Sequence, residues 1–255
     1  MRKQLVIFGT GNAATVLSLL FAEQGHGILQ VYGRDAAKAA ELAKRCNAAA
    51  ISDLAGVDMN ADLYVIAVSD SAVASVAAGL QLGDRLLVHT AGSVSKEVLK
   101  TATTNYGVLY PVQSMRAKMG DAPDIPFLVD ANTEAGIETL KEIALTVSDK
   151  VQQSNDDQRL RLHVAAVIVS NFTNHLYALA AEYCKKEGTD FSMLLPLISE
   201  VANRIQDASP KDVQTGPAIR HDQSTINKHL ELLKEFPELQ QLYAALSNSI
   251  ENMYR

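Results

Sequence analysis

The sequence predicts an α/β protein, with a doubly wound, mainly parallel β-sheet in its N-terminal part and an all-α C-terminal domain. Two observations lead to this prediction. Up to about residue 152, short apolar runs alternate with helical patterns, as in a series of βα units. Beyond that point long helical patterns continue, and no further strand is recognisable. We therefore expect a sheet domain over residues 1–152 and a helical domain over residues 153–255.

The individual elements of the sheet domain follow from the same alternation. Apolar runs predict strands at 4–8, 28–32, 63–68, 85–89, 107–111 and 126–130. Helical patterns lie between them at 12–24, 35–46, 70–80, 94–102 and 133–146. Asp35 and Asp70 precede two of these helices and are predicted to be their N-caps.

A long helix is predicted to open the C-terminal domain. Ser154 and Asp157 have the spacing of a capping box, and the helical pattern continues to about Lys186. The segment 164–169 is apolar on every side, which predicts burial all round. A second copy of the chain would bury it; the alternative is a central helix surrounded by its own domain.

The composition is that of a folded globular protein, with 47% apolar and 20% charged residues. The net charge of −6 argues against nucleic acid or an anionic membrane as partner.

Cysteines and histidines give no sign of a disulfide framework or a metal site. Cys46 and Cys184 are too few for a disulfide framework. The six histidines form no close HxH or HxxxH pair, so we expect no metal. No signal peptide or membrane span is expected, and the predicted location is the cytoplasm.

The most informative motif lies between the first predicted strand and helix and reads Gly9-Thr10-Gly11-Asn12-Ala13-Ala14. In a dinucleotide-binding fold of the Rossmann type, the first glycine permits the tight turn and the second lets the pyrophosphate approach the backbone. The N–H groups at the start of the helix then face the phosphates. We therefore predict that residues 9–13 bind a nucleotide cofactor. The alternative is an ordinary strand-to-helix turn, where small residues are also frequent.

The end of the second predicted strand distinguishes NADP from NAD. An acidic residue there binds the ribose 2′-hydroxyl of NAD, whereas an arginine accommodates the 2′-phosphate of NADP. The sequence has Gly33 and Arg34 at this point, which favours NADP over NAD. Two alternatives stay open: Arg34 is a solvated surface residue, or Asp35 contacts an NAD ribose instead of capping its helix.

Later strand ends supply further candidates. Ala67, Val68 and Ser69 should border the cofactor, because ligands of such sheets lie outside the carboxyl ends of the strands. His89 is a candidate catalytic residue, although a structural histidine at a strand end is the alternative. The segment 110–114 ends with Ser114, a candidate for the substrate side of the cleft.

Four longer segments make a resemblance definite: HTAGS (89–93), YPVQSM (110–115), HVAAVIVSNF (163–172) and TGPAIRHDQSTINKHL (215–230). With the glycine turn, they resemble a family of Rossmann-like NADP oxidoreductases that have an all-helical C-terminal domain and a largely uncharacterised function. The resemblance covers essentially the whole chain. The family is similar in architecture to pyrroline-5-carboxylate reductase, deazaflavin-dependent NADP oxidoreductase and the β-hydroxyacid dehydrogenases. The resemblance implies a homodimer formed through the C-terminal helices, with the active site between domains.

The long helix departs from those relatives. β-Hydroxyacid dehydrogenases use a catalytic lysine followed by an asparagine there, whereas this chain has His163 and Asn171 with no lysine between them. Eight residues apart on a helix, both side chains fall on nearly the same face. His163 is therefore a candidate proton donor, with Asn171 beside it; hydrogen bonding inside a helical core or dimer contact is the alternative. Arg220 is a candidate anchor for a substrate carboxylate, against a salt bridge to Asp222 or across a dimer.

These observations predict an NADP-dependent oxidoreductase that transfers a hydride between the nicotinamide and a small, anionic carbonyl or imine metabolite. The alternative from another class is a catalytically silent NADP-binding sensor or structural dimer, because function does not follow from fold alone. The missing lysine favours the alternative, and the set of polar candidates favours the enzyme.

Overall fold

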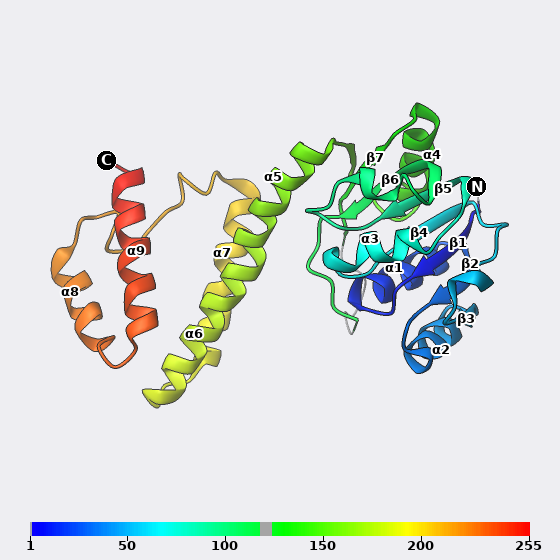
Figure 1. Ribbon diagram of the computed structural model, residues 1–255. Helices are drawn as coiled ribbons and strands as arrows, with labels where there is room; N and C mark the ends of the chain where they lie inside the picture. The colour runs from blue at the N-terminus through cyan, green and yellow to red at the C-terminus, as the bar shows by residue number, and fades with distance from the viewer. Residues whose placement is uncertain (1, 118–123) are drawn as a thin grey trace. The chain divides into compact units, whose positions relative to one another are not determined.

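The computed structural model describes residues 2–117 and 124–255. Contacts between Cα atoms divide the chain into two compact units, Met1–Asn171 and Phe172–Arg255, which are described separately below. Figure 1 shows the sheet and its helices in the first unit and helices alone in the second.

The first unit contains an eight-stranded sheet, counted over its described residues, with the order β3-β2-β1-β4-β5-β6-β7-β8. All neighbours pair in parallel except β6 and β7, which are antiparallel. The chain runs outward from β1 first in one direction and then in the other, as in a doubly wound sheet. The strands are β1 (Gln4–Phe8), β2 (Gly27–Tyr32), β3 (Ala49–Ile51), β4 (Leu63–Ile66), β5 (Gly83–His89), β6 (Thr103–Pro111), β7 (Phe127–Ala131) and β8 (Val151–Gln153).

Helices cover both faces of this sheet. The α-helices between its strands are α1 (Asn12–Glu23), α2 (Ala36–Arg45), α3 (Asp70–Ala78) and α4 (Glu134–Ala144). Residues of α1, α2 and α4 share one buried apolar cluster with Leu5 and Ile7, whereas those of α3 share the other with Val6 and Phe8. Successive residues of β1 thus point to opposite faces, and all four are fully buried. The predicted fold class is confirmed.

One predicted element needs correction, and two strands were missed. The segment expected to be helical at 94–102 forms only a short 3-10 turn, Lys96–Leu99. Strands β3 and β8 were not predicted, because three residues are too few to show a hydrophobic period.

Two predicted helix caps also differ, whereas Asp35 caps α2 as predicted by accepting the N–H groups of Ala37 and Lys38. Helix α3 begins at Asp70 itself, with Ser69 in the N-cap position. The capping box predicted at Ser154 lies one residue later, between Asn155 and Gln158. In both cases a neighbouring polar residue takes the expected position, a shift within the usual uncertainty of helix ends.

The long helical stretch begins with α5 (Asp156–Ala166), continues through a π-helical segment, Val167–Phe172, and ends with α6 (Thr173–Lys186). The second unit further contains α7 (Leu195–Asp207), α8 (Gln223–Leu232) and α9 (Pro237–Met253). No strand occurs among residues 172–255, all of which the structure describes.

The stretch Asp156–Lys186 is unusually apolar for a helix with an exposed surface. Among the described residues it is the one helix long and apolar enough to cross a membrane by length and composition, with a mean hydropathy of 1.3 in its apolar window. Contrary to the expected burial, Val164, Ile168 and Val169 are exposed in the single chain, Val169 to 72%. Such a surface is typical of a contact with another molecule.

Candidate functional site

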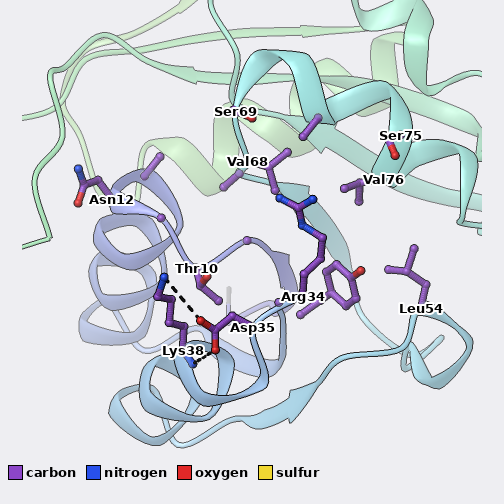
Figure 2. Close-up of a pocket in the computed structure, with 17 residues that line it drawn as sticks. Thr10, Asn12, Arg34, Asp35, Lys38, Leu54, Val68, Ser69, Ser75 and Val76 are labelled. Carbon is purple, nitrogen blue, oxygen red and sulfur yellow. Dashed lines mark hydrogen bonds and ion pairs between the residues drawn. The ribbon is translucent and has the colours of Figure 1, made fainter.

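A hollow of about 630 Å³ lies at the carboxyl ends of β1, β2 and β4. It is lined by the glycine turn, by the residues after β2 and by those after β4 (Figure 2). The structure therefore brings together every residue predicted to bind the cofactor: Gly9, Thr10, Gly11, Asn12, Ala13, Gly33, Arg34, Ala67, Val68 and Ser69.

The glycine turn has the shape that phosphate binding requires. Gly9 has φ +134°, and a Cβ there would lie 2.3 Å from the carbonyl oxygen of Ala67, so only glycine fits against β4. Gly11 occupies the N-cap position of α1, where no side chain caps the helix and a Cβ would meet nothing within 4 Å. The first turn of α1 thus offers backbone donors beside an open space, which suits the pyrophosphate of a dinucleotide.

Gly33 holds the turn after β2 close to the glycine turn. A Cβ on Gly33 would lie 2.6 Å from the Thr10 side chain, so a larger residue would push the two turns apart. Arg34, directly after it, is exposed, extends into the hollow toward Val68 (Figure 2) and has no ion pair within the part of the chain that the structure describes. This unpaired cation at the end of β2 is suited to the 2′-phosphate of NADP.

The carboxylate of Asp35 caps α2 and is not free for a ligand. Its carboxylate accepts backbone N–H groups of α2 at 3.1 and 3.2 Å and lies 3.6 Å from Lys38 Nζ. The hydrogen bond from the Lys38 N–H is the main reason why the pKa of Asp35 is lowered. Lys38 also lines the hollow, which the sequence did not indicate, because its position is that of an ordinary solvated residue in an alanine-rich helix.

A second hollow, of about 590 Å³, lies between the end of β6 and the helical stretch formed by the end of α5 and the π-helical segment. Most of its lining is apolar, and none of the lining residues is an aspartate, glutamate, lysine or arginine. Ser114, His163 and Asn171 all line it, as does Tyr110, so three of the residues predicted for the substrate side come together here.

Tyr110 and His163 form the polar centre of this second hollow. Tyr110 Oη lies 3.0 Å from His163 Nδ1, and the two rings meet edge to face. Gly92 backs the pair, because a Cβ on Gly92 would lie 2.6 Å from Nδ1 of His163. With Nδ1 engaged, Nε2 on the other side of the ring is the atom available to a ligand. Burial, together with the charge of Asp70, raises the pKa of Tyr110, so the phenol stays protonated and can donate to Nδ1.

The two hollows are linked through a hydrogen bond. Asn12, in the glycine turn, accepts the N–H of Ala117 through its Oδ1 at 3.1 Å. Ala117 follows β6 in the same segment as Ser114, which lines the second hollow. The glycine turn of the first hollow is therefore bonded to the segment that continues from the second hollow.

His89 is buried away from both hollows, so its side chain cannot contact a ligand bound in either of them. Its side chain is 0% exposed and lines neither hollow, and its Nδ1 accepts the N–H of Ala91 at 3.2 Å. Burial lowers the pKa of His89 to about 4, and the Arg159 guanidinium adds to the decrease. These features match the structural alternative, a neutral histidine that shapes the loop after β5.

Arg220 belongs to the second unit. It is exposed and forms no ion pair with described residues, so the salt bridge to Asp222 is not seen. Asp222 instead caps α8 by accepting the N–H and the hydroxyl of Thr225. Within residues 2–117 and 124–255 there is no group of three or more His, Cys, Asp or Glu side chains that could hold a metal ion.

Comparison with known proteins gives two family matches. Residues 4–92 match the family described as NADP oxidoreductase, coenzyme F420-dependent, and residues 125–250 match a domain of unknown function, DUF2520. A search of curated protein sequences gives no match.

Solved structures give matches over the whole chain. A putative NADP oxidoreductase from Bacteroides fragilis is 41% identical, with 98% of each chain covered and a TM-score of 0.91. A protein from Thermotoga maritima is 26% identical over 98% of each chain, with a TM-score of 0.72. A reductive aminase from Aspergillus terreus, in complex with NADPH and ethyl-5-oxohexanoate, shares the fold at 17% identity and a TM-score of 0.72, covering 99% of this chain and 93% of that one.

The buried His89 predicts a pH-dependent stability. Its pKa in the folded protein, about 4, lies below the ordinary value of 6.5, so the unfolded chain binds the proton more tightly. The free energy of unfolding should therefore fall as the pH decreases from about 6.5 toward 4, by up to about 3 kcal/mol at 1.36 kcal/mol per pKa unit. Urea unfolding of the wild type and His89→Gln across this range measures the effect.

The glutamine variant should lose most of this pH dependence, whatever its stability at pH 8. His175→Gln, at an exposed position of α6, is the control and should keep it. Equal slopes for wild type and His89→Gln would show that His89 is not buried in neutral form.

Proposed function

Because the chain belongs to the NADP oxidoreductase family represented by the Bacteroides fragilis protein, we propose that it reduces a small carbonyl or imine with NADPH, using His163 as the proton donor. The observation that carries the proposal is the Tyr110–His163 pair, a polar centre in a mainly apolar hollow of the same unit that holds the nucleotide turn.

The first hollow would hold the cofactor. The N–H groups of α1 and the space at Gly11 suit the pyrophosphate, and Arg34 would bind the 2′-phosphate. Lys38 is a second cation at the same rim, although its ion pair with Asp35 reduces the charge that it presents. Bound NADPH would supply the hydride; the protein supplies orientation and the proton.

His163 is placed to give that proton. Hydride addition to a C=O or C=N bond leaves a basic oxygen or nitrogen, which needs a donor in contact with it. Nδ1 of His163 accepts from the Tyr110 hydroxyl, and this leaves Nε2–H to donate into the hollow. As Nε2 gives up its proton, Nδ1 would take the proton of the Tyr110 hydroxyl, which leaves a neutral imidazole and a phenolate. Asn171 lines the same hollow eight residues further along the helix and would orient the substrate by hydrogen bonding.

The substrate would be small, with an apolar body on the lining of the second hollow. This lining has no arginine or lysine that could pair with an anionic substrate. Arg220, exposed and without an ion pair among described residues, stays our candidate for binding a substrate carboxylate.

We further propose a homodimer in which the long helical stretch forms the contact. An apolar surface left in water destabilises a protein, and each large apolar side chain gains about 1.5–3 kcal/mol when fully buried. The net charge of −6 does not favour an anionic membrane as the covering surface. The exposed apolar residues of this stretch are Leu160, Leu162, Val164, Ile168, Val169 and Phe172.

Arg34→Ala should weaken NADPH binding selectively. Loss of a hydrogen-bonded ion pair to the 2′-phosphate should raise the Kd for NADPH by about 10- to 100-fold and leave that for NADH unchanged. Isothermal titration calorimetry with both nucleotides measures this. Arg45→Ala, an exposed arginine of α2 outside the hollow, is the matched control. Equal weakening of both nucleotides would refute the NADP assignment.

Hydride transfer is tested with NADPH deuterated at either C4 position, incubated with the protein and a metabolite extract. We expect deuterium in a carbonyl- or imine-derived product. With that substrate, His163→Gln should lower turnover by roughly 10²- to 10⁴-fold without changing the Kd for NADPH, because it removes the proton donor. His175→Gln is the control. Tight NADPH binding with no transfer to any metabolite would instead favour the silent sensor.

Ile168→Asp should convert the dimer to a monomer or an unfolded chain, because it places a carboxylate in an apolar contact. Light scattering after size exclusion gives the mass, and circular dichroism reports folding. Leu145→Asp, at an exposed leucine outside the long helical stretch, should stay dimeric. A folded dimer for Ile168→Asp, or a wild type that is dispersed only with detergent, would contradict the proposed contact.

A further inference from the structure

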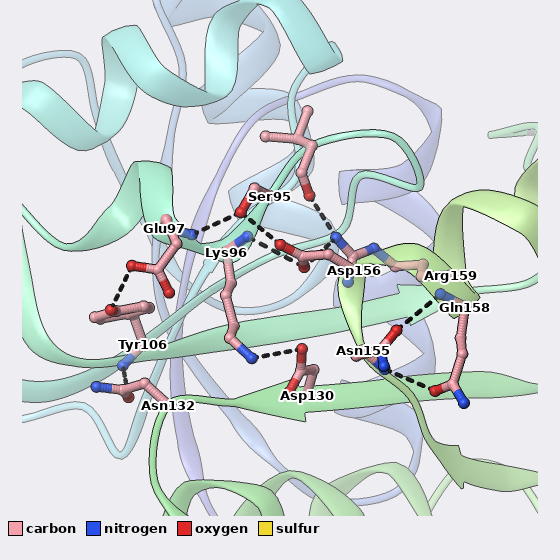
Figure 3. A network of polar contacts seen from close by, with 11 residues as sticks. Ser95, Lys96, Glu97, Tyr106, Asp130, Asn132, Asn155, Asp156, Gln158 and Arg159 are labelled. Atoms are coloured by element: carbon pink, nitrogen blue, oxygen red, sulfur yellow. Dashed lines mark hydrogen bonds and ion pairs between the residues drawn. The ribbon is translucent and has the colours of Figure 1, made fainter.

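A line of polar contacts joins α5 to the loop that follows β5 (Figure 3). At the start of α5, Asp156 accepts hydrogen bonds from the Ser95 hydroxyl at 2.5 Å and from the Lys96 N–H at 3.4 Å. One turn further, Nη2 of Arg159 donates to the carbonyl oxygen of Val94 and, at 2.8 Å, to Asp156. These contacts fix the loop against the first turns of the helix.

His163 continues the same line. It lies four residues after Arg159, on the same face of the helix, and packs against Gly92. Loop residues from 96 back to 92 therefore contact helix residues from 156 forward to 163, in order. His163 also holds its 3.0 Å contact with Tyr110 from this position, so the placement of α5 against the loop decides whether the imidazole reaches the phenol.

Arg159 is the central member of this line and the most deeply buried charged group in the described part of the chain. Its side chain is 1% exposed, and Nε and Nη1 have no hydrogen-bond partner among the described residues. Burying a guanidinium with unpaired donors is unfavourable for stability, so stability does not explain its presence. Both of its hydrogen bonds leave from one atom, Nη2, which therefore joins the Val94 carbonyl of the loop to the Asp156 carboxylate of the helix.

The carboxylate that holds Arg159 stays charged. Burial acts to raise the pKa of Asp156, but the hydrogen bonds from Ser95 and Arg159 outweigh it and keep the pKa below its usual value. The Asp156–Arg159 contact is thus an ion pair at neutral pH.

We propose that Arg159 is a positioning residue: through Val94 and Asp156 it fixes the place of His163 over Gly92, so that the Tyr110 hydroxyl donates to Nδ1 and Nε2 carries the proton that the substrate receives. The role of His163 rests on the proposed function, whereas its placement by Arg159 can be measured without any substrate.

The measurement is the tautomer of His163, read from the ¹⁵N shifts of its ring in protein labelled at histidine, with Tyr110→Phe as the reference for a lost hydrogen bond. We expect the Nε2–H tautomer in the wild type and loss of this single-tautomer signal in Arg159→Met, as in Tyr110→Phe. Lys96→Met is the matched control: it removes the 2.8 Å ion pair with Asp130 in the same part of the fold but keeps the backbone N–H that bonds Asp156, so the tautomer should be unchanged.

Turnover gives the second readout. If a substrate is found by deuterium transfer, Arg159→Met should lower kcat by roughly 10- to 100-fold with an unchanged Kd for NADPH, as expected for a displaced donor. Should this variant not fold, Arg159→Lys, which keeps the charge but moves the donor atom because its side chain is shorter, should show a partial loss of the same signal. A wild-type tautomer in a folded Arg159 variant would overturn the positioning role. A tautomer change in a protein that transfers no hydride would refute the proposed function alone.

Discussion

Parallel pairing from β2 to β6 is the constraint on which the rest of the structure depends. Because Phe8 pairs beside Ile66, Ile66 beside His89 and His89 beside Val108, the strands end together at one edge of the sheet. Segments far apart in the sequence therefore emerge side by side: the glycine turn, the loop after β5 and the end of β6. The glycine turn and the segments after β2 and β4 line the first hollow, and the end of β6 lines the second together with α5 and the π-helical segment.

The site was most predictable from the sequence at positions where the backbone has room for glycine alone. Gly9 and Gly33 each fill a position that a Cβ would obstruct, and both stand in a motif that can be recognised without coordinates. Family comparison agrees with the fold and the NADP oxidoreductase assignment made on that basis. Element ends and the shortest strands were less predictable, because three residues carry no period and neighbouring polar residues compete to cap a helix.

Side-chain partnerships were least predictable. Arg159 stands among charged and polar residues, Asp156, Asp157 and Gln158, so its sequence context reads as a solvated helix start. Only the fold shows that it is buried against Val94, 65 residues away. The same is true of Tyr110 and His163, which were noted separately but not as a pair. The apolar residues around Ile168 differ from the expectation in the opposite direction. Their pattern predicted burial, but they are exposed in the single chain.

Gly92 has a consequence for how such proteins can vary. Its missing side chain makes room for the imidazole of His163, and a Cβ would also come within 3.0 Å of Tyr110. The three positions are therefore sterically coupled. A homologue with alanine at position 92 would therefore need a smaller residue than histidine at position 163 and a small shift of the Tyr110 ring, whereas a homologue that keeps histidine should keep glycine. Covariation of these positions would thus distinguish, from sequence alone, members that retain the imidazole from those that have replaced it.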